Sequence, residues 1–156
     1  GKTPPSLASL ILETIYKNNK RRIKHIGSES FGVQFSLKGI YIHNGLYYFH
    51  TQLANQTNVP FSIDFMTFKV VDKKTARRTA SQQITLVPLR IYKTLDEISG
   101  NAADQNVFLL DQFTIADDKQ LLIEIFEKNG GRHQTLELEN SDLVKAGLIS
   151  DMHLKF

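Results

Sequence analysis

Segment 39–72 constrains the fold more than any other part of this chain of 156 residues. Its sequence, GIYIHNGLYYFHTQLANQTNVPFSIDFMTFKVVD, contains two long apolar and aromatic runs separated by the polar residues 55–60. Aromatic and β-branched residues fit a pleated, partly buried surface, and Asn44-Gly45 in the first run is a strong signal for a tight hairpin turn. We therefore predict that this segment forms β-strands and that the remaining strands pair with it.

The second run predicts an irregular strand. Phe61, Ile63 and Phe65 are two residues apart, so their side chains would point to one face of a regular strand. Phe68 is an odd number of residues away from them and would point to the opposite face. One face of a sheet can hold both sets only if an extra residue shifts the phase of the strand, so we predict a β-bulge near Phe65–Thr67. The alternative is a strand whose two faces are both covered.

Five further segments are predicted to be strands. They are Phe31–Lys38, Gln82–Arg90, Val107–Ile115, Gln120–Lys128 and His133–Glu139. In the first of them Phe31 begins an apolar alternation, so we expect it to face the core together with Val33. Pro88 cannot donate to a β-ladder, which places the second strand at a sheet edge or ends it at Val87. An exposed edge near Pro88 or near Phe31–Leu37 would equally allow a partner strand to add to the sheet.

Short polar connections are predicted between these strands. Ala116–Lys119 has the composition of a hairpin turn between the third and fourth of them, and Asn129–Arg132 that of the next turn. Residues 91–106 are expected to be an irregular connection with a helical turn near Thr94–Ile98.

Two short helices are predicted, one near each end of the chain. Four apolar residues recur at near-helical spacing, at Leu7, Leu10, Ile11 and Ile15. We expect this helix to have Ser6 as its N-cap and to end at Asn18-Asn19. A helix of three turns is marginal alone, so it must pack on the body or on a partner. The second helix is predicted near Asp142–Ala146, capped by Asn140 or Ser141.

These segments give seven or eight strands joined by short turns, with no crossover helices between them. Such connections favour antiparallel pairing, and two packed sheets are a common solution at this length. We predict an all-β fold, an antiparallel two-sheet sandwich of immunoglobulin-like type with a short N-terminal helix and a small C-terminal helix. An open or closed barrel is the alternative. Residues 1–30 would be the N-terminal helix and basic arm, and residues 31–156 the β-sandwich domain.

Positive charge is concentrated near the N-terminus. Residues 1–38 carry seven Lys or Arg against two Glu, whereas the remaining residues carry twelve basic against fourteen acidic side chains. The densest cluster is KRRIKHI at 20–26, with the cations Lys20, Arg21, Arg22 and Lys24. These cations are the candidates for contact with an acidic partner or anionic lipid, whereas the usual interpretation of such a short charge run is a solvated helix end that leads into a loop. Nucleic acid is not favoured, because its binding surfaces interleave aromatic residues with cations and this cluster has none.

The sequence contains no pattern for catalysis or cofactor binding. It has no cysteine, which excludes disulfides and thiolate chemistry. No two of its five histidines are four residues apart, and the Asp117-Asp118 pair lacks the spacing of a calcium loop. We therefore expect a protein that is not an enzyme and holds no cofactor or metal. No run of about 18 apolar residues occurs, so we expect no transmembrane segment in this chain.

Several segments together resemble the TraN proteins of Bacteroidetes conjugative transposons, a DUF4138-type family. They are Gly39–Ile42, Leu46–Asn55, Val59–Phe65, Lys73–Leu89, Phe113–Ile115, Lys119 with Leu121–Glu127, and the turn Glu127–Arg132. The resemblance covers about residues 15–150 and consists of a pattern of strands and turns, without catalytic motifs.

The resemblance implies a place in the cell envelope. TraN-like proteins belong to the mating apparatus that moves transposon DNA between cells. They are similar to the β-rich subunit of the outer-membrane core complex of type IV secretion systems, which binds a small lipoprotein. The implied partners are other transfer-apparatus proteins, a lipoprotein among them, and the implied location is periplasmic or outer-membrane-associated. Family members are longer and exported, so we expect this chain, which begins at Gly1 without a signal-peptide pattern, to be their C-terminal β-domain.

The functional hypothesis is an assembly module that docks other proteins through sheet edges and the N-terminal helix. The predicted partner-binding residues are four apolar side chains of that helix and four cations of the arm. They are Leu7, Leu10, Ile11, Ile15, Lys20, Arg21, Arg22 and Lys24. The alternative is a DNA- or carbohydrate-binding β-sandwich module. Carbohydrate binding usually uses an exposed Trp or Tyr platform, and the chain has no Trp.

Overall fold

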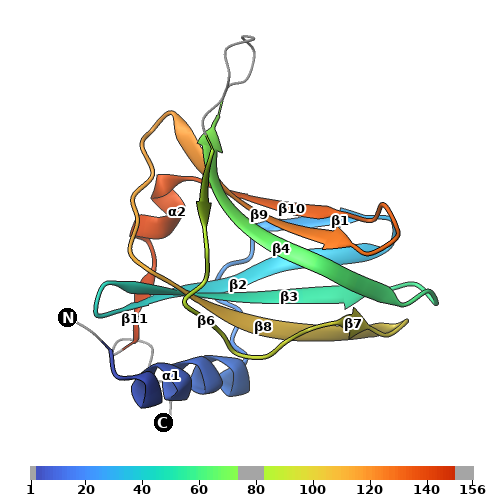
Figure 1. Cartoon of the computed structure of the whole chain (residues 1–156), viewed down its shortest axis with the longest axis horizontal. Coiled ribbons are helices and arrows are strands. Elements are labelled where there is room, and N and C mark those ends of the chain that lie inside the picture. The colour runs from blue at the N-terminus through green and yellow to red at the C-terminus, as the bar shows by residue number, and fades with distance from the viewer. Residues whose placement is uncertain (1–2, 74–82, 150–156) are drawn as a thin grey trace.

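Two β-sheets pack against each other in the computed structural model, which describes residues 3–73 and 83–149 (Figure 1). The first sheet contains, in spatial order, β1 (Gly27–Ser30), β2 (Val33–His43), β3 (Leu46–Asn55), β8 (Ala102–Leu110) and β6 (Arg90–Ile91), and β11 (Gly147–Leu148) pairs with β2. The second sheet contains β10 (Gln134–Leu138), β9 (Lys119–Glu127), β4 (Phe61–Asp72) and β5 (Ile84–Leu86), and β7 (Glu97–Ile98) pairs with β4. The helices are α1 (Pro5–Asn18) and α2 (Asn140–Val144). The predicted antiparallel two-sheet sandwich with two short helices is confirmed.

The hairpin of β2 and β3 lies within the first sheet and forms as segment 39–72 predicts. Asn44 and Gly45 make its two-residue turn, with φ angles of 51° and 75° that asparagine and glycine adopt more readily than other residues. β3 pairs on its other side with β8. Both faces of β3 are covered, because Phe49 packs between the sheets and Tyr48 packs under α1.

β4 contains the bulge that the sequence predicts, slightly earlier than expected. The register between β4 and β9 shifts between Ile63 and Phe65 instead of within Phe65–Thr67. The shift allows Phe61, before the bulge, and Phe68, after it, both to point between the sheets, where each is at most 1% exposed. Phe65 is left on the outer surface and is 48% exposed.

The main core lies between the two sheets. The ring of Phe68 on β4 meets two rings of the first sheet edge-on, with centroid distances of 5.8 Å to Phe49 and 5.3 Å to Phe108. Alternate residues of β9 point into the same space, as the sequence predicts. They are Leu121, Ile123 and Ile125.

The predicted hairpin at Ala116–Lys119 is wrong. β8 ends at Leu110, and residues 111–118 cross to the second sheet, where β9 pairs with β4 and β10. Phe113 and Ile115 on this crossing pack against the core. Their apolar character therefore reflects the packing of a connection between sheets and not pairing within a strand.

β8 begins at Ala102, earlier than predicted, and no helical turn forms at Thr94–Ile98. The first half of β8 is polar, so no pattern of apolar residues indicates a strand there. Its polar side chains bond to the neighbouring segment: the Asn106 amide donates to the carbonyl of Lys93 at 2.7 Å and accepts from its backbone N–H at 3.1 Å.

Phe31 lies in a turn, contrary to the prediction that it is part of a strand. β1, which the sequence analysis missed, pairs with β2 and leaves Phe31 and Gly32 between them. Their φ angles are 54° and 72°, and Phe31 is 70% exposed. Alternation alone extends the pattern of β2 back to Phe31, whereas these positive φ angles reverse the chain at that point.

Pro88 lies between two edge strands, β5 and β6, where the sequence predicts a single strand that lies at a sheet edge or ends at Val87. β5 pairs with β4 of the second sheet, and β6 pairs with β8 of the first. The connection 87–89 therefore passes from the edge of one sheet to the edge of the other (Figure 1). Gln82, where the predicted strand begins, lies outside the described residues.

The C-terminal elements largely follow the prediction. The turn at 129–132 joins β9 and β10 in a hairpin. α2 begins at Asn140, two residues before the predicted start, and Glu139 is its N-cap in a capping box with Asp142. β11 was missed; it runs parallel to β2 and pairs with it at Tyr41.

Candidate functional site

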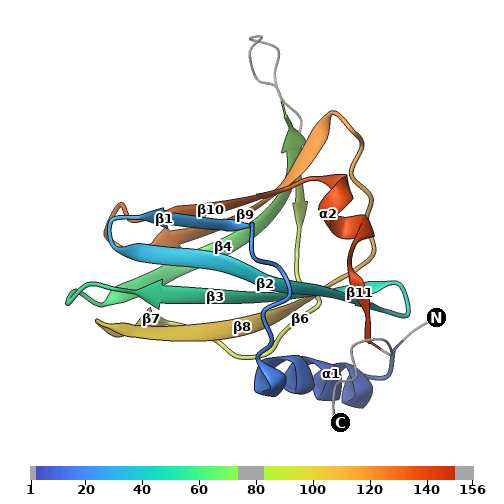
Figure 2. The ribbon, with the colours of Figure 1, turned by 180° about the vertical axis from the view of Figure 1, so that it is seen from behind.

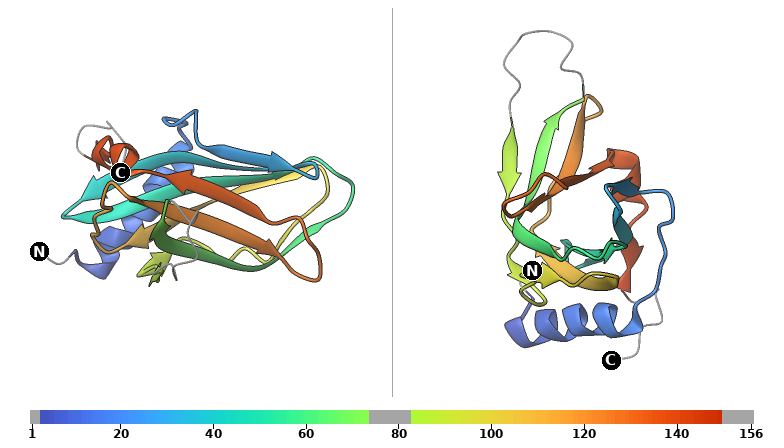
Figure 3. Two further views of the ribbon diagram at one scale, coloured as in Figure 1. Left: turned by 90° about the horizontal axis from the view of Figure 1, so that it is seen from above. Right: turned by 90° about the vertical axis from the view of Figure 1, so that its right-hand side faces the viewer.

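α1 packs on the face of the first sheet that points away from the second sheet (Figures 2 and 3). Ile11 and Ile15 are each 1% exposed and lie in a cluster with side chains of β2, β3 and β8. The helix begins at Pro5 with Pro4 at the N-cap position, so the predicted Ser6 cap is wrong. Asn19, in the left-handed conformation, ends it.

The four predicted docking side chains of α1 have different environments. Ile11 and Ile15 are buried by the chain itself, and Leu7 packs partly against the same cluster. Leu10 is 41% exposed. The helix is therefore docked within its own chain, and Leu10 is the side chain of the four that a partner could reach most readily.

A polar cluster attaches the C-terminal end of α1 to the first sheet. The ring of Tyr16 stacks on Tyr92 with centroids 4.6 Å apart. The ammonium of Lys93 donates to the Tyr16 hydroxyl and to Asp104, both at 2.7 Å. Burial alone lowers the pKa of Lys93, but these two hydrogen bonds outweigh it and raise the pKa above the ordinary value. Such contacts hold α1 against the first sheet.

The chain after α1, residues 19–26, is named the arm here. It runs from α1 to β1 along the side of the first sheet (Figure 2). The backbone N–H groups of Arg22 and Ile23 donate to the carbonyl of Lys38 at 2.8 and 2.9 Å. The Lys38 ammonium bonds to Asn19, and burial lowers the pKa of Lys38. The arm is thus held by backbone bonds, which leaves its cationic side chains outside.

The predicted cations of the arm all lie on the surface. They are Lys20, Arg21, Arg22 and Lys24, and each is exposed. None of the four forms an ion pair with a described residue. The arm therefore carries positive charge that no acidic side chain among the described residues pairs with.

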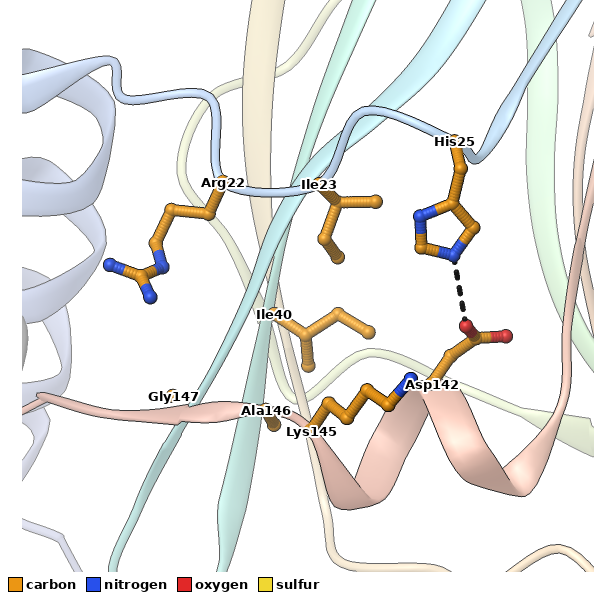
Figure 4. Close-up of a pocket in the computed structure, with 8 residues that line it drawn as sticks. All are labelled: Arg22, Ile23, His25, Ile40, Asp142, Lys145, Ala146 and Gly147. Carbon is orange, nitrogen blue, oxygen red and sulfur yellow. Dashed lines mark hydrogen bonds and ion pairs between the residues drawn. The ribbon is translucent and has the colours of Figure 1, made fainter.

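A pocket of about 160 Å³ opens between the arm and α2 and is named the arm pocket (Figure 4). Its lining residues are Arg22, Ile23, His25, Ile40, Asp142, Lys145, Ala146 and Gly147. It lies where the edge of β2 is interrupted, because β1 pairs with Val33–Ser36 and β11 pairs with Tyr41–Ile42. His25 Nε2 and Asp142 Oδ1, 3.2 Å apart, connect the arm to α2 across its mouth.

A second surface lies at the corner between β5 and β6 and is named the edge patch. Its members are large apolar side chains that are 48–76% exposed: Phe65, Ile84, Val87, Leu89 and Ile91. Phe65 and Ile91 line one groove of about 270 Å³, together with partly buried apolar side chains such as Leu95. Within the described residues, β5 pairs with β4 alone and β6 with β8 alone. Unpaired strand edges beside exposed apolar side chains are suited to strand addition by a partner.

His50 on β3 is a fully buried titratable side chain of the first sheet, at 0% exposure. Its Nε2 bonds to Oε1 of Gln105 on the neighbouring strand β8. Burial lowers the pKa of His50 to about 4, so the imidazole is neutral at physiological pH. Its environment is a structural one under α1 and not a pocket.

Sequence reasoning identified the arm cations, of which Arg22 lines the arm pocket, but missed the other seven lining residues. His25 lies inside the basic cluster, so the cluster itself was a local signal for it. Asp142, Lys145 and Ala146 join the arm only because β11 pairs with β2, and no local pattern predicts that pairing.

Residues 3–73 and 83–149 contain neither an arranged metal site nor a membrane-spanning helix. No group of three or more His, Asp or Glu side chains among these residues is arranged to hold a metal ion. No helix in this part of the chain has the length and apolar character to cross a membrane.

A family model described as "Domain of unknown function (DUF4138)" matches residues 5–148, which is most of the chain. No curated protein sequence matches this chain.

Proposed function

This chain is a member of the DUF4138 family, and we propose that it is a TraN-like assembly component of a conjugative transfer apparatus. In this role it is not an enzyme. It docks other proteins of a type IV secretion-like mating channel in the cell envelope, in the periplasm or at the outer membrane. The support is the family match over residues 5–148 together with the resemblance of the strand-and-turn pattern to TraN proteins.

The observation that carries the docking role is the edge patch. An apolar strip that continues from the edge of one sheet to the edge of the other is unusual for a surface that faces water alone. Val87 and Leu89 flank Pro88 and are 76% and 55% exposed. A partner strand added to either edge would bury these side chains and satisfy unpaired backbone groups at the same time.

The partners in this proposal are other transfer-apparatus proteins, a small lipoprotein among them. The exposed cations of the arm offer a second, charged contact for the same assembly. Charged contacts of this kind steer association and select partners more than they add affinity.

A capture experiment tests the proposal. The immobilised chain is exposed to extracts of cells that carry the whole transfer region, and the bound proteins are identified by mass spectrometry. Val87→Asp with Leu89→Asp should remove the envelope transfer proteins from the captured set, because two charges disrupt the apolar strip. Val59→Asp, which alters a residue 61% exposed on a separate loop, is the control and should capture the same proteins as wild type.

Two results would overturn the proposal. One is that the wild-type chain captures no transfer protein. The other is that it captures nucleic acid alone, with binding that falls steeply as salt rises, which is the signature of phosphate contacts. The second result would favour the DNA-binding alternative, for which the supporting observation is that the arm cations form no ion pair with a described residue.

A further inference from the structure

The arm pocket combines an apolar floor with a cationic rim. Ile40 on β2 is 4% exposed, and the partly buried Ile23 and Ala146 lie beside it and pack against the main core. Figure 4 shows the two isoleucines between Arg22 on one side and the His25–Asp142 pair on the other. A ligand that enters this pocket therefore meets hydrocarbon at the centre and charge at the margin.

The rim carries more positive than negative charge. Arg22 and Lys145 are exposed, and neither forms an ion pair with a described residue. Asp142 is the single acidic side chain of the lining, and both its oxygens have partners. Oδ2 accepts the Glu139 backbone N–H at 2.9 Å, and Oδ1 faces His25 at 3.2 Å. Both oxygens are thus engaged within the fold, and the two cations Arg22 and Lys145 outnumber this one carboxylate in the lining.

We propose that the arm pocket binds an acidic peptide segment of a partner protein. The segment inserts one branched aliphatic side chain between Ile23, Ile40 and Ala146, and its carboxylates lie against Arg22 and Lys145. This inference rests on the proposed function, because it names the chemistry of one docking partner at a surface separate from the edge patch.

Size and charge both fit this occupant. The pocket has about 160 Å³, and an apolar cavity of about 150 Å³ accommodates a group as large as benzene. The surrounding N-terminal region is the basic part of the chain, with seven Lys or Arg against two Glu in residues 1–38. A phosphate group or a nucleic-acid backbone would leave the apolar floor without a contact, so these ligands fit the pocket less well.

Nuclear magnetic resonance titration with a defined probe tests the inference. The probe is a short synthetic peptide with a central leucine between glutamates, and the matched peptide has serine in place of the leucine. We expect the leucine peptide to shift the resonances of Ile23, Ile40 and Ala146. The serine peptide should bind about tenfold more weakly, because it forgoes burial of an aliphatic side chain.

Charge reversal on the rim provides the second measurement. Lys145→Glu should weaken binding of the leucine peptide by about fivefold or more, because it replaces an attractive contact with a repulsive one. Lys128→Glu makes the same change of charge at an exposed position outside the pocket and should have little effect.

Three results would overturn the inference. The first is equal affinity for the leucine and serine peptides. The second is an equal loss of affinity for the leucine peptide in Lys145→Glu and Lys128→Glu. The third is binding of inorganic phosphate or anionic vesicles with no binding of the leucine peptide. If any of them occurs while the capture experiment still recovers transfer proteins, the proposed function stands and only the assignment of this pocket fails. If the peptide binds but capture fails, the pocket stands and the assembly role does not.

Discussion

Arg132 holds both carboxylate oxygens of Glu127. Its side-chain Nε and Nη2 donate to Oε2 at 3.0 and 2.6 Å, and its backbone N–H donates to Oε1 at 3.0 Å. The two side chains are only 15% and 10% exposed. The same guanidinium donates to the carbonyl of Pro60 at 2.8 Å and lies over the ring of Phe61 at 5.3 Å. This pair therefore fastens the β9–β10 turn to the loop that precedes β4.

Removal of the arginine should be costly. We expect Arg132→Ala to lower the free energy of unfolding by about 3 kcal/mol, because it leaves a largely buried carboxylate without its partner. Arg132→Lys should be more stable than Arg132→Ala but less stable than wild type, since an ammonium cannot reproduce the fork of donors of a guanidinium. Urea unfolding measures both. A loss below about 1 kcal/mol in Arg132→Ala would mean that the pair behaves like an ordinary surface ion pair.

The same pair predicts a response to acid. Hydrogen bonds from Arg132 lower the pKa of Glu127 below its ordinary value of 4.5. Its contribution to stability is therefore complete above pH 4.5 and is lost as the pH falls through the lowered, folded-state pKa. We expect Glu127→Gln to be less stable than wild type at pH 7 and to lose less stability between about pH 5 and pH 3. Parallel acid-unfolding curves for both proteins would contradict this expectation.

His50 predicts a separate loss of stability at milder acidity. Burial lowers its pKa from 6.5 to about 4. Below pH 6.5 the unfolded chain binds a proton at this position that the folded chain does not bind, so stability falls with decreasing pH until the folded-state pKa is reached. Between pH 7 and pH 5 this amounts to about 2 kcal/mol.

Matched variants isolate the contribution of His50. In urea unfolding at several pH values, His50→Gln should show a flatter pH dependence between pH 7 and pH 5 than wild type. His25→Gln removes an exposed imidazole and should keep the slope that His50 produces. If His50→Gln retains the full slope, the proton uptake belongs to another group.

Local signals explain which parts of the fold the sequence predicted. The Asn44-Gly45 turn, the parity change in β4 and the apolar stripe of α1 each lie within a few residues, and all three appear in the structure. The missed elements depend on distant pairing. Residues 111–118 carry strand-like apolar residues across to the other sheet, and β11 pairs with a strand about a hundred residues earlier in the chain.

The candidate site likewise has one part that the sequence predicted and another part that it did not. The arm cations form a run in the sequence, so the charge cluster could be predicted. The pocket beside them could not, because Asp142 and Lys145 reach it only through the pairing of β11 with β2. The docking prediction for Ile11 and Ile15 illustrates a further limit: an amphipathic stripe shows that a helix buries one face, but it does not identify what covers that face.

Because α1 packs on the first sheet, we expect alanine substitutions at two neighbouring residues of α1 to change the stability by very different amounts. Ile11→Ala should lower the free energy of unfolding by about 2–4 kcal/mol, because it leaves a cavity between α1 and the first sheet. Leu10→Ala, at the adjacent position, should change it by less than about 0.5 kcal/mol, because Leu10 is 41% exposed. Thermal or urea unfolding measures both. Equal effects would mean that α1 does not dock on the sheet in solution.

Two glycines offer a last matched comparison. Gly32, in the turn between β1 and β2, has a φ of +72°, and a Cβ atom there would lie 2.4 Å from Cγ2 of Thr57. Thr57 cannot easily retreat, because Oδ1 of Asn55 accepts hydrogen bonds from its hydroxyl at 2.7 Å and its backbone N–H at 3.1 Å. We therefore expect Gly32→Ala to cost about 2 kcal/mol of stability, from backbone strain and the steric clash together.

Gly131 is the control for that substitution. A Cβ atom at Gly131 would meet nothing within 4 Å, and its φ is outside the left-handed range. Gly131→Ala should therefore be neutral within about 0.5 kcal/mol, or slightly stabilising because alanine restricts the unfolded chain more than glycine. Urea unfolding of the two variants separates strain at a turn from a general cost of adding a methyl group. If Gly32→Ala is as stable as Gly131→Ala, the turn between β1 and β2 must adopt another conformation in solution.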